Sequence, residues 1–272
     1  MRPTRRLSLK LALAAAAAST LPAFAQTPDE ETAETPAGEA APTTFETEGG
    51  TVTVIPVEHA SLYLVAPGHV MLIDPVGDPA LYADMPAPDL ILITHEHGDH
   101  FDAETLAAVA PQDARLITNP AVHALLPPEL QARATAMANG DELDLDTLRI
   151  EAVPAYNITP ERLEYHPEGR DNGYVLTIAD KRVYIAGDTE ATDEMKALED
   201  IEVAFIPMNL PYTMTPEQAA EGVAAFAPAR VYPYHHRDTD LTVFTEALAA
   251  SGAQTQVVIL DWYPQTGEAA AD

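Results

Sequence analysis

The 272-residue sequence contains no cysteine. It can therefore form no disulfide and offers no thiolate, so any metal site must be built from nitrogen and oxygen ligands. Positive charge is also scarce: the sequence contains 14 Lys and Arg residues and 43 Asp and Glu residues, a net charge of −29. No cation occurs between Lys10 and Arg115. A surface this acidic repels phosphate backbones, and we expect no nucleic acid partner.

Long apolar runs are missing too, and the longest, residues 11–21, belongs to a short segment at the amino terminus. A basic start containing Arg5 and Arg6 precedes this Ala-rich run, and the small-residue site Ala23-Phe24-Ala25 follows it. The run is too short for a membrane span and has the layout of an export signal. We predict cleavage after Ala25, a periplasmic or secreted protein, and no stable membrane anchor after cleavage. The paired arginines favour twin-arginine export, with an ordinary Sec signal as the alternative.

The remaining chain divides by composition. Residues 26–48 are rich in Thr, Pro, Ala and acid, with Phe45 as the one large apolar residue, so we predict a disordered acidic leader. Residues 49–264 can bury a full core and form the predicted catalytic domain. Residues 265–272 are a polar tail. The parts expected are thus a signal peptide at 1–25, the leader, the domain and the tail.

A dense group of metal-binding side chains follows the apolar run 90–93. Residues 94–100 read Thr-His-Glu-His-Gly-Asp-His. Imidazole and carboxylate are ligands that zinc, iron and manganese accept. Because residues two apart in an extended segment point the same way, His95 and His97 can hold one ion, while Gly98 lets the chain turn and present Asp99 and His100 to a second. The alternative is a solvated polar loop that happens to be rich in histidine.

This pattern resembles the signature of the metallo-β-lactamase superfamily, and later landmarks resemble the branch that contains L-ascorbate-6-phosphate lactonase. The resemblance covers about residues 49–264. It implies an α/β fold, the αββα four-layer sandwich, with mixed and mostly antiparallel sheets. Strands alternating with single helices agree with this architecture. Strands are predicted at 51–55, 61–65, 70–73, 90–94, 115–118, 148–153, 173–179, 182–186, 201–207, 230–233 and 257–260. Helices are predicted at 103–109, 121–126, 216–226 and 244–250, and a turn at 140–146.

The resemblance also assigns later residues. Gly187-Asp188-Thr189 ends a predicted strand and is similar to the family's Gly-Asp-Thr, whose aspartate bridges two metals. His235 follows another strand and is expected to complete the second metal, chosen over His236 by its spacing from a proline. Asp74 resembles a structural aspartate beneath the metal loop, where it would hydrogen-bond to a ligand.

The sequence departs from the family at Asn157, where a further histidine ligand is usual. A carboxamide oxygen is a weak ligand, so the first metal is either bound loosely or completed by another group, for which His166 is the nearest candidate. A single tightly held metal is the third possibility. His59 is expected near the metal site but not as a direct ligand.

Three further residues are candidates for substrate binding, with ordinary loop packing as the alternative for each: Tyr156, Asn209 and Tyr212.

The first metal would be held by His95, His97 and Asp188 with Asn157 or His166, and the second by Asp99, His100, Asp188 and His235. We expect two divalent ions, zinc first and manganese or iron as alternatives. Metal binding lowers the pKa of water from about 15.7 to about 7 and so supplies hydroxide. Asp99 would act as the catalytic residue that orients this hydroxide and carries its proton.

The sequence therefore predicts a metal-dependent hydrolase that attacks a small-molecule ester, lactone or amide with a metal-bound hydroxide. The alternatives are phosphodiester or β-lactam hydrolysis, iron-dependent oxygen chemistry, and a metal-depleted scaffold that only binds a ligand. The sequence identifies no protein partner.

Overall fold

The structure of the protein is a computed structural model that describes residues 43–263. The predicted signal peptide (1–25), most of the predicted leader and the predicted tail (265–272) lie outside this range, so these assignments remain predictions. No helix within residues 43–263 has the length and apolar character that a membrane crossing requires.

Two seven-stranded sheets form the centre of the described chain. In the first sheet the strands follow one another in sequence order: β1 (Thr43–Thr47), β2 (Gly50–Glu58), β3 (Ser61–Ala66), β4 (His69–Ile73), β5 (Leu90–Ile93), β6 (Arg115–Thr118) and β7 (Ala134–Ala136). The second sheet is ordered in the same way: β8 (Glu142–Leu145), β9 (Leu148–Ala155), β10 (Asp171–Ile178), β11 (Lys181–Ile185), β12 (Ile201–Pro207), β13 (Arg230–Tyr234) and β14 (Gln256–Val257).

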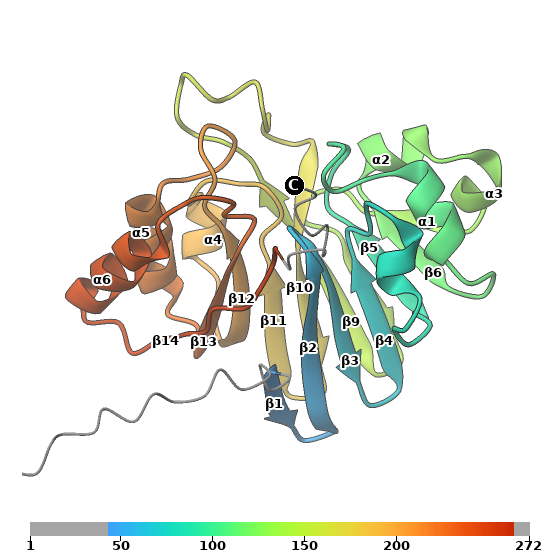
Figure 1. Ribbon diagram of the computed structural model, residues 1–272, viewed down its shortest axis with the longest axis horizontal. Helices are drawn as coiled ribbons and strands as arrows, with labels where there is room; N and C mark the ends of the chain where they lie inside the picture. Colours follow the sequence, from blue (N-terminus) through green and yellow to red (C-terminus); the bar gives the residue numbers. More distant parts are fainter. Residues whose placement is uncertain (1–42, 264–272) are drawn as a thin grey trace, which may run out of the picture. The chain divides into compact units, whose positions relative to one another are not determined.

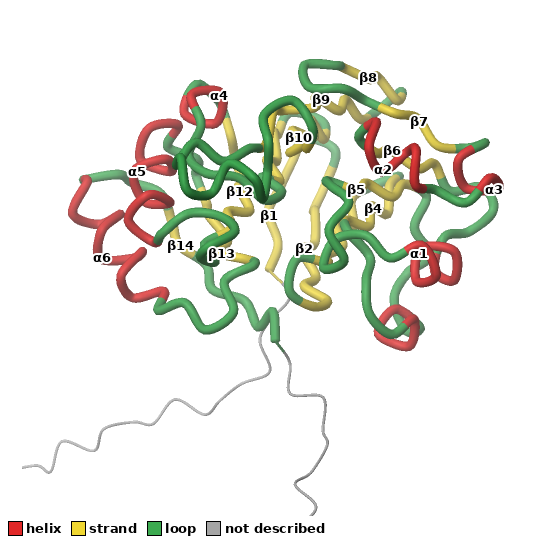
Figure 2. The backbone as a smooth tube through the Cα atoms, turned by 90° about the horizontal axis from the view of Figure 1, so that it is seen from above, coloured by secondary structure: helices red, strands yellow, loops and turns green. Residues whose placement is uncertain are grey.

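Helices lie along the outer faces of both sheets, with the first group beside β4 to β6 and the second beside β12 to β14 (Figures 1 and 2). The first group consists of η1 (Pro79–Tyr82), α1 (Ala103–Val109), α2 (Pro120–Leu125) and α3 (Pro128–Gln131). The second group consists of α4 (Asp193–Lys196), α5 (Pro216–Phe226) and α6 (Leu241–Ser251).

Three apolar cores hold these layers together. One fills the space between the sheets and includes Leu62, Ile150 and Phe205. A second lies between the first sheet and its helices, and a third between the second sheet and α4 to α6. The αββα four-layer sandwich is thereby confirmed.

Both sheets are mixed, as predicted, but antiparallel pairings do not predominate in either. Within residues 43–263, each sheet contains three antiparallel pairings followed by three parallel ones. The parallel half of each sheet is the half in which helices connect the strands, because a helical crossover returns the chain in the same direction. The second half of each sheet therefore presents the carboxyl ends of its strands at one common edge.

Local sequence explains the helix ends well. Asp102 accepts hydrogen bonds from the first turn of α1, and Thr215 and Gln218 form a reciprocal capping box at the start of α5. Both helices begin and end where the sequence predicted.

The short elements η1, α3, β7 and α4 were not predicted, and β14 is shorter than the predicted strand 257–260. Two further segments differ in kind. Residues 43–47 form β1 rather than part of a disordered leader, because Phe45 is buried in the core between the sheets. Residues 142–145 form strand β8 rather than a turn. Leu143 and Leu145 pack against the core while the alternating acids face solvent, a period-2 pattern only four residues long.

Candidate metal centre

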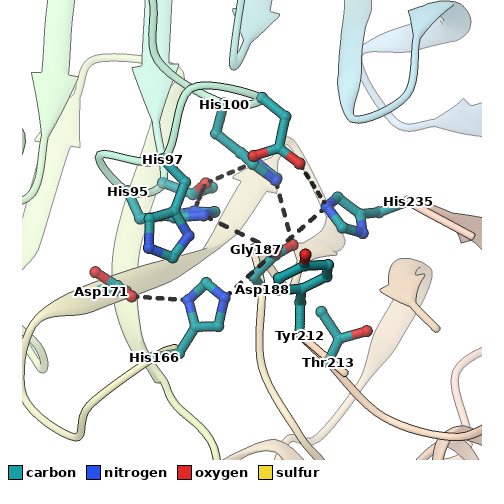
Figure 3. Close-up of polar contacts among 12 residues, drawn as sticks. His95, His97, His100, His166, Asp171, Gly187, Asp188, Tyr212, Thr213 and His235 are labelled. Atoms are coloured by element: carbon teal, nitrogen blue, oxygen red, sulfur yellow. Dashed lines mark hydrogen bonds and ion pairs between the residues drawn. The ribbon is translucent and has the colours of Figure 1, made fainter. Parts of the chain in front are cut away.

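Four imidazole rings converge on the carboxylate of Asp188 (Figure 3). The Nε2 atom of His100 lies 3.3 Å from it, that of His235 3.3 Å, that of His166 3.5 Å and that of His95 3.9 Å. Asp188 and all four rings are buried. These residues follow β5, β9, β11 and β13, so the fold gathers them at one edge of the sandwich.

In two of these rings the Nδ1 atom is hydrogen-bonded to a carboxylate outside the cluster. His100 Nδ1 lies 2.8 Å from Asp74 Oδ2, and His166 Nδ1 lies 3.0 Å from Asp171 Oδ2. An Nδ1–H that donates to a carboxylate leaves the Nε2 lone pair directed inward, as metal ligation requires. The hydrogen bond predicted for Asp74 is present.

The ring nitrogens and carboxylates fall into overlapping groups whose members lie within 4.8 Å of one another. The groups are His95, His97 and His166; His95, His100 and Asp188; and His59, Asp99, His100 and His235. They overlap with the two predicted ligand sets, but one group also contains His59, and Asp188 is grouped only with His95 and His100.

The chemistry of the donor atoms fits divalent ions. Within residues 43–263, buried polar atoms that lack a hydrogen-bond partner include the Nε2 atoms of His95, His100, His166 and His235, and Oδ1 of Asp188. Leaving so many buried polar atoms unpaired is costly unless another group satisfies them. Cations between these atoms would do so, because imidazole and carboxylate are suitable ligands for zinc, iron or manganese.

Electrostatics holds the two central carboxylates in the charged form. Burial opposes ionisation of Asp188, but His235 and His100 outweigh it and hold its pKa well below the usual value. Burial likewise opposes ionisation of Asp99, while hydrogen bonds with His235 and His59 lower its pKa. Burial holds the pKa of His95 well below 6.5, so this ring is neutral and able to ligate at neutral pH.

His100 differs from its neighbours. Burial lowers its pKa, but the charge and hydrogen bond of Asp188, together with the hydrogen bond to Asp74, raise it well above 6.5. A divalent ion would have to displace the proton from this ring, so metal binding here releases a proton.

His166, and not Asn157, joins His95 and His97. The backbone N–H of Asn157 donates to the carbonyl of His166 at 2.9 Å, which closes the loop 157–170 and leaves His166 beside His95 and His97. Asn157 Nδ2 donates to the carbonyls of Arg162 at 2.9 Å and Tyr212 at 2.8 Å. Of the two alternatives left by the sequence, the geometry favours His166.

His59 lies closer to the centre than the sequence suggested. Its Nε2 atom lies 3.2 Å from Asp99 Oδ2 and its Nδ1 atom 2.9 Å from the hydroxyl of Tyr263. The turn between β2 and β3 places it there, and its carbonyl accepts from the N–H of His235 at 3.1 Å. No local sequence pattern predicts these contacts, because they join positions about 40 to 200 residues apart.

A glycine is required beside the bridging aspartate. Gly187 has a φ of +65°, and a Cβ atom there would lie 2.8 Å from the Asn172 carbonyl oxygen and 3.2 Å from Thr94 Cβ. The chain reverses tightly between β11 and Asp188 only because no side chain occupies this position.

A cavity of about 590 Å³ opens over the centre. Two predicted substrate-binding residues, Asn209 and Tyr212, line it. The third, Tyr156, is not among the lining residues, and its hydroxyl donates to Glu194 at 2.9 Å. Substrate binding by Tyr156 therefore stays a prediction.

Sequence reasoning missed other residues of the lining. Tyr165, Leu210, Pro211 and Arg237 contribute side chains to it together with His97, Asp99 and Asp188. Tyr165 and Leu210 to Tyr212 come from two loops whose course no periodic pattern predicts.

Known proteins that resemble this chain include metal-dependent hydrolases. The beta-lactamase superfamily domain matches residues 69–236 of the chain. A UPF0173 metal-dependent hydrolase from Methanopyrus kandleri is 30% identical over 217 residues, which cover 75% of this chain and 94% of that protein. This chain belongs to the metallo-β-lactamase superfamily, within the UPF0173 metal-dependent hydrolases.

Two solved structures are also similar to this chain. A protein from Parabacteroides distasonis, named as a metal-dependent hydrolase, is 43% identical with a TM-score of 0.74, and the match covers 80% of this chain and 97% of that one. Igni18, a metallo hydrolase from Ignicoccus hospitalis, is 23% identical with a TM-score of 0.64, covering 77% and 94%, and shares the fold. The predicted enzyme class, a metal-dependent hydrolase, is confirmed. The lactonase branch stays a prediction.

Proposed function

We propose that this metal-dependent hydrolase acts on a small-molecule ester, lactone or amide with two divalent ions, zinc first among them. The observation that supports this most is the convergence of unpaired imidazole nitrogens on Asp188 at the floor of a cavity. A cavity of about 590 Å³ accommodates a small molecule.

The ligand sets follow the geometric groups. His95, His97 and His166 would hold one ion, and Asp99, His100 and His235 the other. Asp188 would serve both, because its carboxylate lies 3.3 to 3.9 Å from His95, His100, His166 and His235. Ions bound there would act as Lewis acids and lower the pKa of water to about 7.

Asp99 is the residue we propose for proton handling. Its carboxylate lines the cavity, and hydrogen bonds with His59 and His235 keep it ionised and oriented. An ionised carboxylate at the cavity floor can orient the attacking water and accept its proton. His59 in turn is held by the hydroxyl of Tyr263.

Two considerations support an acyl substrate. The net charge of −29 opposes binding of polyanions such as nucleic acids. The sequence also resembles the branch that contains L-ascorbate-6-phosphate lactonase. Export to the periplasm, if the predicted signal operates, would supply extracytoplasmic substrates.

The test is a substrate screen of metal-reconstituted protein with lactones, esters, amides, phosphodiesters and β-lactams. We expect turnover of a lactone, ester or amide, and we expect His97→Ala to lower kcat/KM at least about 100-fold. His123→Ala, which removes a histidine on α2 away from the centre, serves as the matched control and should retain activity. Turnover confined to phosphodiesters or β-lactams would refute the proposed substrate class.

A further inference from the structure

Arg237 places a guanidinium group at the mouth of the cavity. Its Nη2 atom lies 3.8 Å from Asp99 Oδ2, beyond hydrogen-bonding distance, and its side chain is 55% exposed. Among residues 43–263 the guanidinium has no hydrogen-bond partner and no other carboxylate within 4 Å. Its donors are therefore available to a ligand.

Two other arginines near the centre are already engaged. Arg170 donates to both carboxylate oxygens of buried Asp171 at 2.8 and 2.9 Å. Arg162 pairs with buried Glu190 at 2.6 Å. These cations serve the loop that carries the proposed metal ligand, and their charges are compensated within the protein.

The backbone of Arg237 is held close to the centre although its side chain is free. Its φ is +43°, and its N–H donates to the Tyr263 hydroxyl at 2.7 Å. The same hydroxyl lies 2.9 Å from Nδ1 of His59, whose Nε2 contacts Asp99. This connection keeps the base of the arginine at a defined distance from Asp99.

An apolar wall faces the same cavity. It is formed by Leu210, Pro211, Tyr212 and Tyr165. The two tyrosine rings pack edge to face with centroids 5.1 Å apart, and Leu210 and Tyr212 remain 50% and 43% exposed. Exposed apolar groups gathered around one cavity are typical of a binding surface.

We propose that Arg237 binds an anionic group of the substrate, a carboxylate or phosphate, while an apolar substituent of the same molecule lies against this wall. The inference rests on the proposed function and narrows its substrate class. A metal ion bound by Asp99 would neutralise the negative charge of this carboxylate. The positive charge of the Arg237 guanidinium would then have no counter-charge within 4 Å among residues 43–263. In a protein with net charge −29, an anionic substrate needs such a local cation to offset repulsion.

Binding is measured first, by calorimetry on the zinc-reconstituted full chain with phenylacetate, its neutral analogue phenylacetamide, and phenyl phosphate. We expect the wild-type protein to bind an anion about tenfold or more tightly than the amide, because a charge-assisted hydrogen bond contributes that much. Arg237→Gln should bring this ratio close to one, and Arg237→Lys should keep part of it. Arg149→Gln, the same change at a half-exposed arginine on β9, is the control and should keep the ratio.

Phenylacetate and phenyl phosphate differ in their anionic group. Tighter binding of the first would identify a carboxylate as the group that Arg237 binds, and tighter binding of the second a phosphate. An anion preference that is missing in the wild type, or that persists unchanged in Arg237→Gln because metal ions alone bind the anion, overturns the inference.

A kinetic comparison follows with phenyl esters that differ only in a carboxylate. Arg237→Gln should raise KM about tenfold for the anionic ester, with kcat little changed and the neutral ester unaffected. Equal losses on both esters contradict the inference. Failure of all hydrolysis with an intact binding preference refutes the proposed function alone.

Discussion

Asp74 acts on the centre through its neighbours. One carboxylate oxygen accepts from the Thr94 N–H at 2.7 Å, and the other contacts the Thr94 hydroxyl at 2.6 Å and His100 Nδ1 at 2.8 Å. This buried carboxylate therefore orients both the strand end and one proposed ligand. Its φ of +46° is a conformation that asparagine also adopts.

Asp74→Asn tests this role without a backbone penalty. Since outer hydrogen bonds to a ligating histidine contribute about 10- to 100-fold in metal affinity, we expect a loss of that size. A chelating-dye competition titration measures it. Asp146→Asn is the matched control, because Asp146 has a φ of +45° but is exposed in the β8–β9 turn. Equal affinities for all three proteins would contradict the role of Asp74.

Gly187→Ala tests the backbone requirement beside Asp188. The strained φ and the clash with Asn172 and Thr94 should lower the free energy of unfolding by about 2 kcal/mol or more. Gly68→Ala has a comparable φ of +87° but open space around it, so its cost should be about 1 kcal/mol. Denaturant unfolding measures both, and a smaller loss at Gly187 than at Gly68 would refute the packing argument.

At the scale of elements, the loops 157–170 and 208–215 line the cavity, and the side-chain amide of Asn157 hydrogen-bonds to both of them. Asn157 Nδ2 donates to a carbonyl within the loop 157–170 and to Tyr212 in the loop 208–215. Glu190 supports the first loop by accepting from Thr159 N–H at 2.9 Å. The proposed ligand His166 depends on this arrangement.

Asn157→Ala should loosen both loops. Two part-buried carbonyls lose their donor, and each loss costs about 1 kcal/mol. We expect amide hydrogen exchange in 157–170 and 208–215 to become at least about tenfold faster. Gln131→Ala, which removes a side-chain donor to a carbonyl on α2, should leave both loops unchanged. Unaltered exchange in Asn157→Ala would show that other contacts hold the loops.

Elements with strong local signals were predictable. Strand β12 and helix α5 were predicted with their observed bounds, because an unbroken apolar run defines the first and the proline and capping box define the second. Strand β1 was missed, because only Phe45 distinguishes it from the polar sequence around it. Short α4 has few residues from which a period could be read.

Across the whole molecule, the site was predictable where ligands end a strand and not where they come from loops. His95, Asp188 and His235 each follow a buried strand, so the fold dictates their convergence. The sequence left His166 as one of two alternatives and missed Arg237, because loop closure brings the first to the site and a left-handed backbone conformation the second.

Divalent ions should stabilise the entire fold, because they bind donor sets that exist only when both sheets are assembled. At concentrations about 100-fold above the dissociation constant, binding adds about 2.7 kcal/mol. Chelation should therefore lower Tm by about 5 to 10 °C, and added zinc should restore it. Calorimetry measures this change in Tm. The control variant Asp146→Asn should show the same decrease on chelation as the wild type. A Tm that chelation leaves unchanged would contradict the linkage between metal and fold.

The most direct measurement is elemental analysis of the protein purified without chelator, alongside Asp188→Asn. We predict about two equivalents of divalent metal per chain in the wild type and less than one in the variant, because the Asp188 carboxylate lies within 4 Å of histidines from both proposed ligand sets. No bound metal in the wild type, or an equal content in the variant, would contradict the metal centre described above.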